Sequence, residues 1–229
     1  MQVIILAAGR GRRMGSLTNN CPKPMLPIHG RPKLVYTLET LPPAITEVII
    51  IVGYLKEKII NYFGHQYRGK KIKYLVQEEL NGSGGAVLLA KEEVRDRALV
   101  LMGDDLYQPT DLERLLALST PGLLAYQTNQ AEQFGLVTTD QENYLTAVVE
   151  RPHQHRTGLV NTGAYLLTKE YFQFPPVAIS TEEYGLPQTL VSLYPQIKTE
   201  VLTTDWWLPI GSPENLKTAE KILPKSITK

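Results

Sequence analysis

The chain of 229 residues has little of three features that mark specialised classes of protein. It has one cysteine, Cys21, so no disulfide can form within the chain, which is consistent with a reducing cytoplasm. Its formal net charge is only +1, which argues against a broad nucleic-acid-binding surface. No apolar run approaches the length of a membrane span, and the opening apolar stretch is too short for a signal peptide. These shortages predict a cytoplasmic protein without nucleic-acid or membrane partners.

The sequence also has no internal repeat, no low-complexity tract and no flexible linker. Its length suits one large domain with an ample core. Apolar runs at 3–6, 48–52, 72–76 and 98–102 alternate with amphipathic segments at about 33–41, 55–63 and 84–94. This alternation predicts an α/β fold with a mostly parallel sheet. Shorter alternating strands are expected at 136–139, 145–150 and 160–167, and a last helix is expected from Pro213, after the N-cap Ser212, to about Ile222.

The first predicted strand leads directly into a loop rich in glycine and arginine. Gly9, Gly11 and Gly15 let the backbone bend and approach a ligand closely, and backbone N–H groups in such a turn can converge on an anion. The loop and the Pro-Lys-Pro turn that follows add positive charge through Arg10, Arg12, Arg13 and Lys23, which suits a triphosphate. The plain alternative is a solvated basic turn. A P-loop is excluded because no Gly-Lys-Ser/Thr follows, and the glycine spacing departs from the dinucleotide fingerprint.

Residues Leu6 to Met14 and Pro22 to Leu26 resemble the signature of the sugar-1-phosphate nucleotidylyltransferases, also called nucleotide-sugar pyrophosphorylases. That signature reads Leu-Ala-Ala-Gly-x-Gly-x-Arg-Met/Leu, followed by Pro-Lys-Pro-Met/Leu. The resemblance implies a Rossmann-like three-layer α/β/α fold with a mixed, mostly parallel sheet, of the glycosyltransferase-A-like type. It also implies a single stand-alone transferase domain over residues 1–229, similar to the thymidylyl- and uridylyltransferases that act on glucose 1-phosphate. Its nucleotide-binding half would cover about 1–110 and its sugar-phosphate-binding half about 111–229.

The resemblance assigns roles to individual residues of the first half. Arg13, Lys23 and Asp104 would be catalytic, with Asp104, after the strand at 98–102, as a Mg²⁺ ligand. Because Asp104 and Asp105 would face opposite sides of an extended chain, only one of them can point into the ligand crevice. Two solvated carboxylates in a turn are the alternative. The nucleotide itself would be bound by Leu6, Ala8, Gly9, Gly11, Gln77, Gly82 and Ser83.

Gln77 carries the prediction about the base. It precedes Gly82 by the interval found in the family's base-recognition loop. A primary amide both donates and accepts, so it can match the edge of uracil or thymine, whereas guanine would be met well by a carboxylate. We therefore favour UTP or dTTP over other nucleotides.

Three segments of the second half resemble the family's sugar pocket, and together they assign sugar-phosphate binding to Gly135, Glu150, Arg151, Asn161 and Gly163. Arg151 stands where the family has a lysine, and its planar guanidinium is not a geometric equivalent. Taken singly, each segment is also typical of a β-turn. A clear departure follows at Pro209, where the family has a second metal-binding Asp. Asp205 is the nearby candidate to replace it, and water can also fill Mg²⁺ coordination.

The reaction that the resemblance implies is direct attack of a sugar 1-phosphate on the α-phosphorus of the triphosphate. The second pKa of a phosphate monoester is about 6, so this nucleophile needs no strong base, and we find no Ser-His-Asp or Cys-His arrangement. One alternative is a phosphocholine-type cytidylyltransferase, against which the sugar-pocket segments argue. Another is a non-catalytic nucleotide-sugar-binding regulatory protein, for which Pro209 is the support. Relatives often assemble into dimers or tetramers, so a homo-oligomer is possible.

Overall fold

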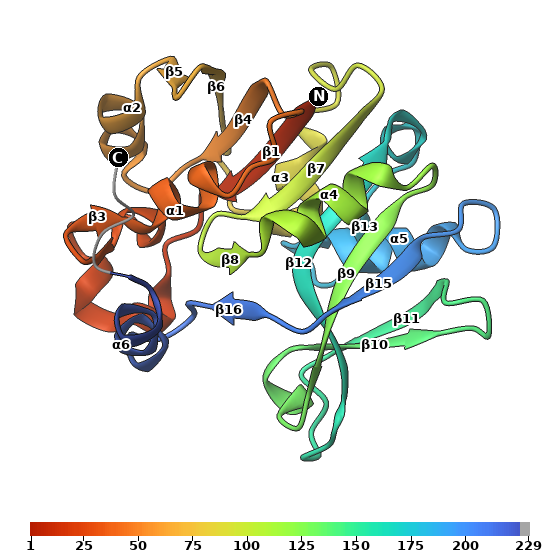
Figure 1. Cartoon of the computed structure of the whole chain (residues 1–229). Helices are drawn as coiled ribbons and strands as arrows, with labels where there is room; N and C mark the ends of the chain where they lie inside the picture. Colours follow the sequence, from red (N-terminus) through yellow and green to blue (C-terminus); the bar gives the residue numbers. More distant parts are fainter. Residues whose placement is uncertain (225–229) are drawn as a thin grey trace.

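The computed structural model describes residues 1–224, and a ten-stranded mixed sheet forms its centre (Figure 1). Eight strands lie in the order β11-β10-β12-β7-β1-β4-β6-β5, while β9 pairs with β12 and β15 pairs with β9. The strands are β1 (Gln2–Ala7), β4 (Glu47–Val52), β5 (Gln66–Tyr67), β6 (Lys70–Val76), β7 (Arg97–Met102), β9 (Gly122–Thr128), β10 (Gly135–Thr139), β11 (Leu145–Glu150), β12 (Gly158–Thr168) and β15 (Glu200–Thr204).

The central strands β7, β1, β4 and β6 run parallel to one another, as the apolar runs predict. Ile5 lies in register with Ile50 on one side and Leu101 on the other, so the middle of the sheet is apolar throughout. Beyond β7 the strands pair antiparallel: β12 pairs with β7, β9 pairs with β12, and β11 pairs with β10. The prediction of a mixed sheet with mostly parallel central strands is confirmed.

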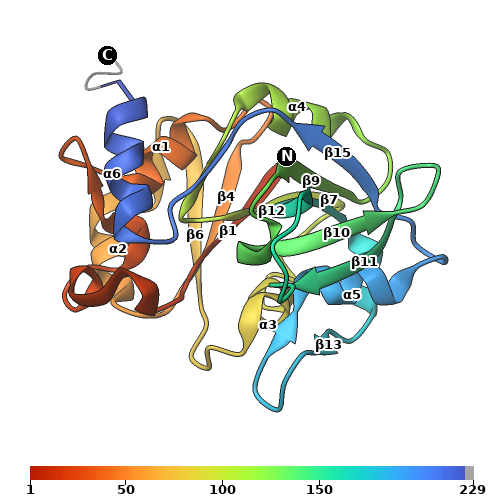
Figure 2. The ribbon, with the colours of Figure 1, turned by 90° about the horizontal axis from the view of Figure 1, so that it is seen from below.

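Helices cover both faces of the sheet, and the alternation of side chains along β1 shows why. Val3 and Ile5 pack in one cluster with α1 (Lys33–Glu39), α2 (Lys56–Phe63) and α4 (Pro109–Ala117). Ile4 and Leu6 pack in a second cluster with α3 (Gly82–Leu88) and α5 (Leu186–Leu193). Successive side chains of a strand point to opposite faces, so one apolar strand contributes side chains to the core on both faces of the sheet. Figure 2 shows α4 and α3 on opposite sides of the sheet, as a three-layer arrangement requires.

The last part of the described chain returns to the N-terminal part. Strand β16 (Trp207–Pro209) pairs with β8 (Asp105–Tyr107), and α6 (Pro213–Ile222) packs beside Ile28 and Tyr36. The predicted start of α6 is confirmed, because the Ser212 side chain accepts from the backbone N–H of Asn215 in a capping box. Short strands β2 (Pro27–Ile28) with β3 (Arg31–Pro32), and β13 (Val177–Ala178) with β14 (Tyr184–Gly185), form two further hairpins.

One helix differs from its predicted bounds by more than the usual fraying. The helix expected over 84–94 is α3, which begins at Gly82 and ends at Leu88. Beyond Leu88 the backbone N–H of Ala90 donates to Val87 and that of Lys91 donates to Leu88, so the chain tightens into three-residue turns. Within the described residues, no helix has both the length and the apolar character needed to span a membrane.

Candidate functional site

A cavity of about 850 Å³ opens at the carboxyl ends of β1 and β7. Ligands of open α/β sheets bind at this edge, and the volume is in the range of small-molecule sites. Its lining comprises Leu6, Ala7, Ala8, Gly9, Arg10, Gly11, Arg12, Lys23, Pro24, Gln77, Glu78, Leu80, Gly82, Ser83, Ala86, Met102, Asp104, Glu182 and Glu183. Every residue that the sequence assigns to nucleotide binding is among them, together with Lys23 and Asp104.

The ends of β1, β4 and β6 hold the glycine-rich loop beside the predicted base-recognition loop, residues 77–86. The backbone N–H of Tyr54 donates to the carbonyl of Ala8 at 3.0 Å, and that of Gln77 donates to Val52 at 2.8 Å. Gly53 lies between the two loops, where a Cβ would come within 2.9 Å of the Ala8 carbonyl and 3.2 Å of the Gln77 carbonyl. Two motifs that are far apart in the sequence therefore meet along one wall of the cavity.

Gly11 allows Lys23 to reach the cavity. It adopts a left-handed conformation with a φ of +65°, and a Cβ there would lie 2.8 Å from the Cβ of Lys23. The hydroxyl of Thr18 donates to the carbonyls of Gly11 and Gly15, and the hydroxyl of Tyr54 donates to the carbonyl of Thr18. These bonds fix the course of the loop, so a larger residue at position 11 would displace the lysine from the cavity wall.

Lys23 and Asp104 form an ion pair on the cavity wall. Their side chains are only 11% and 19% exposed, so the pair is poorly screened by water. Burial alone would raise the pKa of Asp104, but the ammonium groups of Lys23 and Lys33 outweigh burial and hold that pKa below its usual value. Arg13, the third predicted catalytic residue, adds to this effect. However, Arg13 is exposed, lies outside the cavity lining and approaches Gly211 with its guanidinium.

Asp105 points away from the cavity, in keeping with the expectation that adjacent aspartates face opposite sides. Its carboxylate accepts from the indole N–H of Trp207 at 3.2 Å and from the backbone N–H of Ile210 at 3.3 Å. Burial raises the pKa of Asp105, and the neighbouring Asp104 raises it further. Asp105 therefore ties β8 to β16, and of the two adjacent aspartates only Asp104 lines the cavity.

The side chains around Asp104 fit a divalent cation only in a restricted way. In the described residues, no group of three or more His, Cys, Asp or Glu side chains is placed to hold a metal ion. Pro209 lies in register with Asp105 and offers no side-chain oxygen, and Asp205 is exposed and outside the cavity lining. A single carboxylate suits Mg²⁺ when phosphate oxygens and water supply the other ligands. Asp104 therefore suits a cation whose other ligands come mainly from the substrate and from water.

Gln77 is buried in the cavity lining, where base recognition is predicted, and its amide is already partly engaged. Its Nε2 donates to Oδ1 of Asn81 at 2.9 Å and to the carbonyl of Gly82 at 3.2 Å. Both amide hydrogens are used in this way, and the carbonyl of Gly82 fixes which end of the amide is the nitrogen. The group that Gln77 still offers to a ligand is its Oε1 acceptor.

The hairpin formed by β13 and β14 adds two carboxylates that sequence reasoning missed, Glu182 and Glu183. The hairpin docks on the base-recognition loop through the backbone N–H of Tyr184, which donates to Asn81 at 2.8 Å. Gly82 makes this docking possible, because its φ is +87° and a Cβ would lie 2.4 Å from the carbonyl of Tyr184. No motif in the sequence marks these glutamates, since only the tertiary contact brings them to the cavity.

Gly135 and Glu150, two predicted sugar-binding residues, lie opposite each other on β10 and β11. A Cβ on Gly135 would lie 3.0 Å from Oε1 of Glu150, so the missing side chain leaves room for the carboxylate. That oxygen accepts from Nε2 of Gln188 at 3.3 Å. Arg151, which follows, is exposed and has a φ of +44°.

Asn161 and Gly163 form a local turn in β12. The backbone N–H of Gly163 donates to Oδ1 of Asn161 at 2.8 Å, and Nδ2 of Asn161 donates to the hydroxyl of Tyr165 at 2.6 Å. Gly163 also leaves room for Met102, since a Cβ there would lie 2.3 Å from the Cγ of Met102. Met102 lines the cavity, whereas the five predicted sugar-binding residues lie outside its lining. These residues therefore form a neighbouring region that adjoins the cavity through Met102.

Lys33 is a further residue that sequence reasoning missed. It is the first residue of α1, its side chain is 0% exposed, and its Nζ has no hydrogen-bond partner among the described residues. Burial lowers the pKa of Lys33 to about 8, although the nearby Asp104 opposes this shift. A lysine in the first turn of a helix is disfavoured by the helix dipole, and this was the signal that could have identified it.

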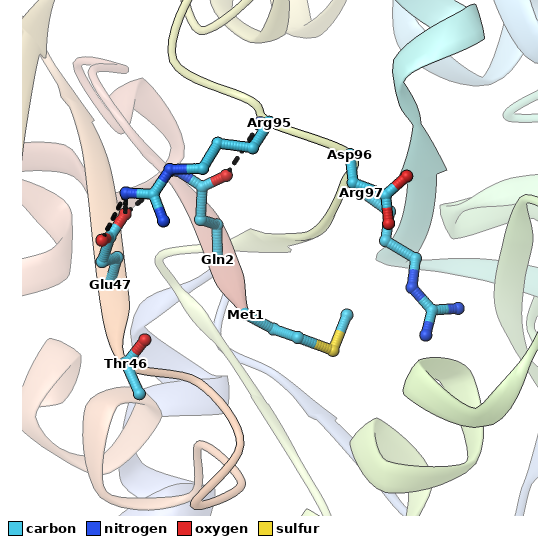
Figure 3. A pocket seen from close by; sticks show the side chains of 7 residues that line it. All are labelled: Met1, Gln2, Thr46, Glu47, Arg95, Asp96 and Arg97. Carbon is cyan, nitrogen blue, oxygen red and sulfur yellow. Dashed lines mark hydrogen bonds and ion pairs between the residues drawn. The ribbon is translucent and has the colours of Figure 1, made fainter.

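A second cavity, of about 210 Å³, lies at the amino ends of β1, β4 and β7 (Figure 3). Three of its polar residues bond to one another: the guanidinium of Arg95 donates to both carboxylate oxygens of Glu47, and the Arg95 backbone N–H donates to Oε1 of Gln2. This arrangement braces three strand ends and leaves few groups to recognise a ligand. The candidate site residues described above lie at the opposite edge of the sheet, around the larger cavity.

Known proteins resemble this chain in both sequence and fold. The sequence pattern of the nucleotidyl transferase family matches residues 2–226. The bifunctional protein GlmU of Methanocaldococcus jannaschii is 35% identical over 97% of this chain and 54% of its own length, so the chain spans about half of that relative. The D-glycero-alpha-D-manno-heptose 1-phosphate guanylyltransferase of Campylobacter jejuni is 35% identical over 94% of this chain and 96% of its own. The crystal structure of a putative glucose-1-phosphate thymidylyltransferase from Bacillus anthracis has the same fold, with a TM-score of 0.85, 23% identity, and coverage of 100% of this chain and 97% of that one.

Proposed function

Because the chain belongs to the nucleotidyl transferase family, we propose that it joins a nucleoside triphosphate to a sugar 1-phosphate, forming a nucleotide sugar and releasing pyrophosphate. The observation that carries this proposal is the Lys23–Asp104 pair on the wall of the large cavity, beside the glycine-rich loop. Transfer of a nucleotidyl group between phosphates requires a cation that neutralises phosphate charge and a carboxylate that can bind a metal ion, and Lys23 and Asp104 can supply them.

In the proposed reaction, an oxygen of the sugar phosphate forms a bond to the α-phosphorus, and the bond to the departing pyrophosphate breaks in line. The sugar phosphate is largely ionised at neutral pH, so the chain's task is alignment and charge neutralisation. Lys23 would leave Asp104 and bind the α-phosphate, while Arg13 would neutralise the triphosphate tail as pyrophosphate leaves. Backbone groups of Gly9 and Gly11 would hold the phosphates against the loop.

Mg²⁺ is the divalent cation that we propose for this site. Asp104 would hold it with phosphate oxygens, and it would neutralise charge on the triphosphate. On the sugar side, Glu150 and Asn161 would accept or donate hydrogen bonds to sugar hydroxyls next to the space left by Gly135 and Gly163. Arg151 would bind the sugar phosphate, for which its exposed guanidinium must turn toward the cavity.

We propose UTP or dTTP as the nucleotide, because the Oε1 acceptor of Gln77 suits the N3–H of uracil or thymine. GTP is a second candidate. The ring N–H of guanine suits the same acceptor, and its amino group suits a carboxylate such as Glu182 or Glu183, both of which line the cavity. The single cysteine supports a cytoplasmic setting for the reaction, and the oligomeric state stays a prediction.

A pyrophosphate-release screen tests the proposal. UTP, dTTP, GTP, CTP and ATP would be crossed with glucose, N-acetylglucosamine, mannose and heptose 1-phosphates, with Mg²⁺ and with EDTA. We expect release only in reactions that contain both substrates and Mg²⁺, and formation of the matching nucleotide sugar by mass spectrometry. Absence of release in every pair would refute the proposed activity.

The same screen with Glu182→Gln and Glu183→Gln distinguishes the two base classes. If guanine is the base, at least one substitution lowers kcat/KM for GTP because a carboxylate acceptor becomes an amide. If uracil or thymine is the base, both variants retain the activity, and Gln77→Ala lowers it. Glu79→Gln serves as the control, because Glu79 is exposed and outside the cavity lining.

A further inference from the structure

Four charged side chains gather at the cavity wall and directly behind it: Lys23, Lys33, Asp104 and Asp105, which we call the charge cluster. Lys23 and Asp104 pair with each other, and Asp105 is bound by Trp207 and Ile210. Lys33 is different, because its fully buried Nζ makes no hydrogen bond with the described residues. The reaction proposed above makes no use of it.

A buried ammonium without a hydrogen-bond partner is costly, so it persists only where other charges offset its loss of water. Asp104 and Asp105 provide that offset, since each is among the charged groups that act on Lys33. Lys33 acts on both carboxyl groups in return. It is anchored where α1 begins, with its backbone N–H donating to the carbonyl of Leu26 at 3.0 Å, and its side chain has no route to solvent.

We propose that Lys33 is a positioning residue that supplies the standing counter-charge to Asp104 when Lys23 turns from Asp104 to a phosphate of the substrate. This inference rests on the proposed function, because it uses the transfer of Lys23 from carboxylate to phosphate. Lys23 lines the cavity and can make that exchange, whereas Lys33 is sealed behind the wall and stays with the carboxylates. The cluster thus has one mobile cation for the ligand and one fixed cation for the protein.

This arrangement predicts opposite effects on anions and on divalent cations. Without Lys33, Lys23 is the nearest ammonium to two carboxyl groups, so it is held more firmly and is less available to a phosphate. The same loss makes the surroundings of Asp104 more negative, so a divalent cation binds more tightly. A purely structural lysine would not separate the two effects, since loosening the cavity wall would weaken the binding of both ions.

The test substitutes Lys33→Met, which keeps an unbranched side chain close to the length of lysine and removes its charge. Binding of inorganic tripolyphosphate in EDTA is measured by calorimetry, and binding of Mn²⁺ to the nucleotide-free protein is measured by electron paramagnetic resonance. We expect the dissociation constant of tripolyphosphate to rise about threefold to tenfold and that of Mn²⁺ to fall by a similar factor, as loss of one nearby charge implies. Thermal unfolding confirms that the variant is folded, and Lys33→Gln replaces it if it is not.

Lys70→Met is the matched control. Lys70 is a half-buried lysine whose Nζ donates to the carbonyls of Pro42 and Ile45, and it neither lines the cavity nor is among the charged groups that act on Lys33. We expect this control to change neither dissociation constant. The inference is overturned if Lys33→Met leaves both constants unchanged or moves them in the same direction. Because both probes lack a base and a sugar, these outcomes are independent of the pyrophosphate screen, and failure of that screen would overturn the proposed function alone.

Discussion

Lys23 and Asp104 lie 81 positions apart in the sequence and form an ion pair in the described fold. The pair depends on the sheet, because β7 lies directly beside β1 and the backbone N–H of Gly103 donates to the carbonyl of Leu6 at 2.9 Å. This contact brings the end of β7 to the glycine-rich loop that follows β1. The residue proposed to bind phosphate and the residue proposed to bind a cation thereby share one cavity wall.

Loss of either proposed phosphate-binding cation is expected to abolish most of the activity. Lys23→Ala and Arg13→Ala should each lower kcat by about a hundredfold or more, since a cationic clamp acts mainly on charge that develops in the transition state. Pyrophosphate release gives the rate, and circular dichroism with thermal unfolding shows whether the fold survives. Lys91→Ala is the control, because Lys91 is exposed and outside the cavity lining. Near wild-type turnover in both variants would contradict the roles given to them.

The sequence was sufficient to predict the parallel centre of the sheet and one wall of its cavity. Residues 48–52 and 98–102 are uninterrupted apolar runs, and a run buried on both faces can be recognised without knowing its neighbours. The glycine-rich loop and Gln77 meet at the cavity because both follow parallel strands, whose carboxyl ends share one edge. Motif order and strand direction together therefore place these residues correctly.

Other parts of the site depend on contacts that local patterns do not encode. Glu182 and Glu183 reach the cavity only because their hairpin docks on Gly82. Strands β9 and β15 were not predicted, and their pairing is set by the sheet rather than by a strong pattern of their own. Helices α4 and α5 were also missed, although each has a proline in its first turn, a recognised starting signal.

Two glycines of the cavity wall should respond differently to a methyl group. Gly82→Ala places a Cβ 2.4 Å from the carbonyl of Tyr184 at a φ of +87°, so it should displace the hairpin and lower the melting temperature. Gly9→Ala meets no atom within 4 Å and should leave the melting temperature nearly unchanged. If Gly9 approaches phosphate, its variant should still weaken tripolyphosphate binding. Equal melting temperatures for the two variants would contradict the docking role of Gly82.

The region around Glu150 should affect the sugar substrate and not the nucleotide. Gly135→Ala brings a methyl group to 3.0 Å from Oε1 of Glu150, so the carboxylate must shift by a few tenths of an ångström. We expect this variant and Glu150→Gln to raise the KM for the sugar 1-phosphate several-fold, by about 1 kcal/mol of binding for one weakened hydrogen bond. The KM for the triphosphate should stay the same. A rise in the triphosphate KM alone would place Glu150 on the nucleotide side.

The buried Lys33 should make the stability of the protein depend on pH in the alkaline range. Its pKa in the folded state is lowered to about 8, whereas an unfolded lysine has a pKa of about 10.4. Between these values the unfolded chain binds a proton that the folded chain does not, so the free energy of unfolding rises with pH. Below this window the cost of burying the charge is fully present, at about 3 kcal/mol from a shift of this size.

Lys33→Met removes that cost and leaves unchanged the ionisable groups that do not interact with Lys33. We expect the variant to be more stable than the wild type at about pH 7, and the difference to shrink as the pH approaches about 10, where the wild-type lysine is neutral in the folded state. Urea unfolding of both proteins at several pH values measures this difference directly. Ionisable groups that do not interact with Lys33 are the same in both proteins and cancel in the comparison, whereas Cys21, Asp104 and Asp105 do interact with it. A difference that stays constant with pH would mean that Lys33 keeps an ordinary pKa in the folded protein.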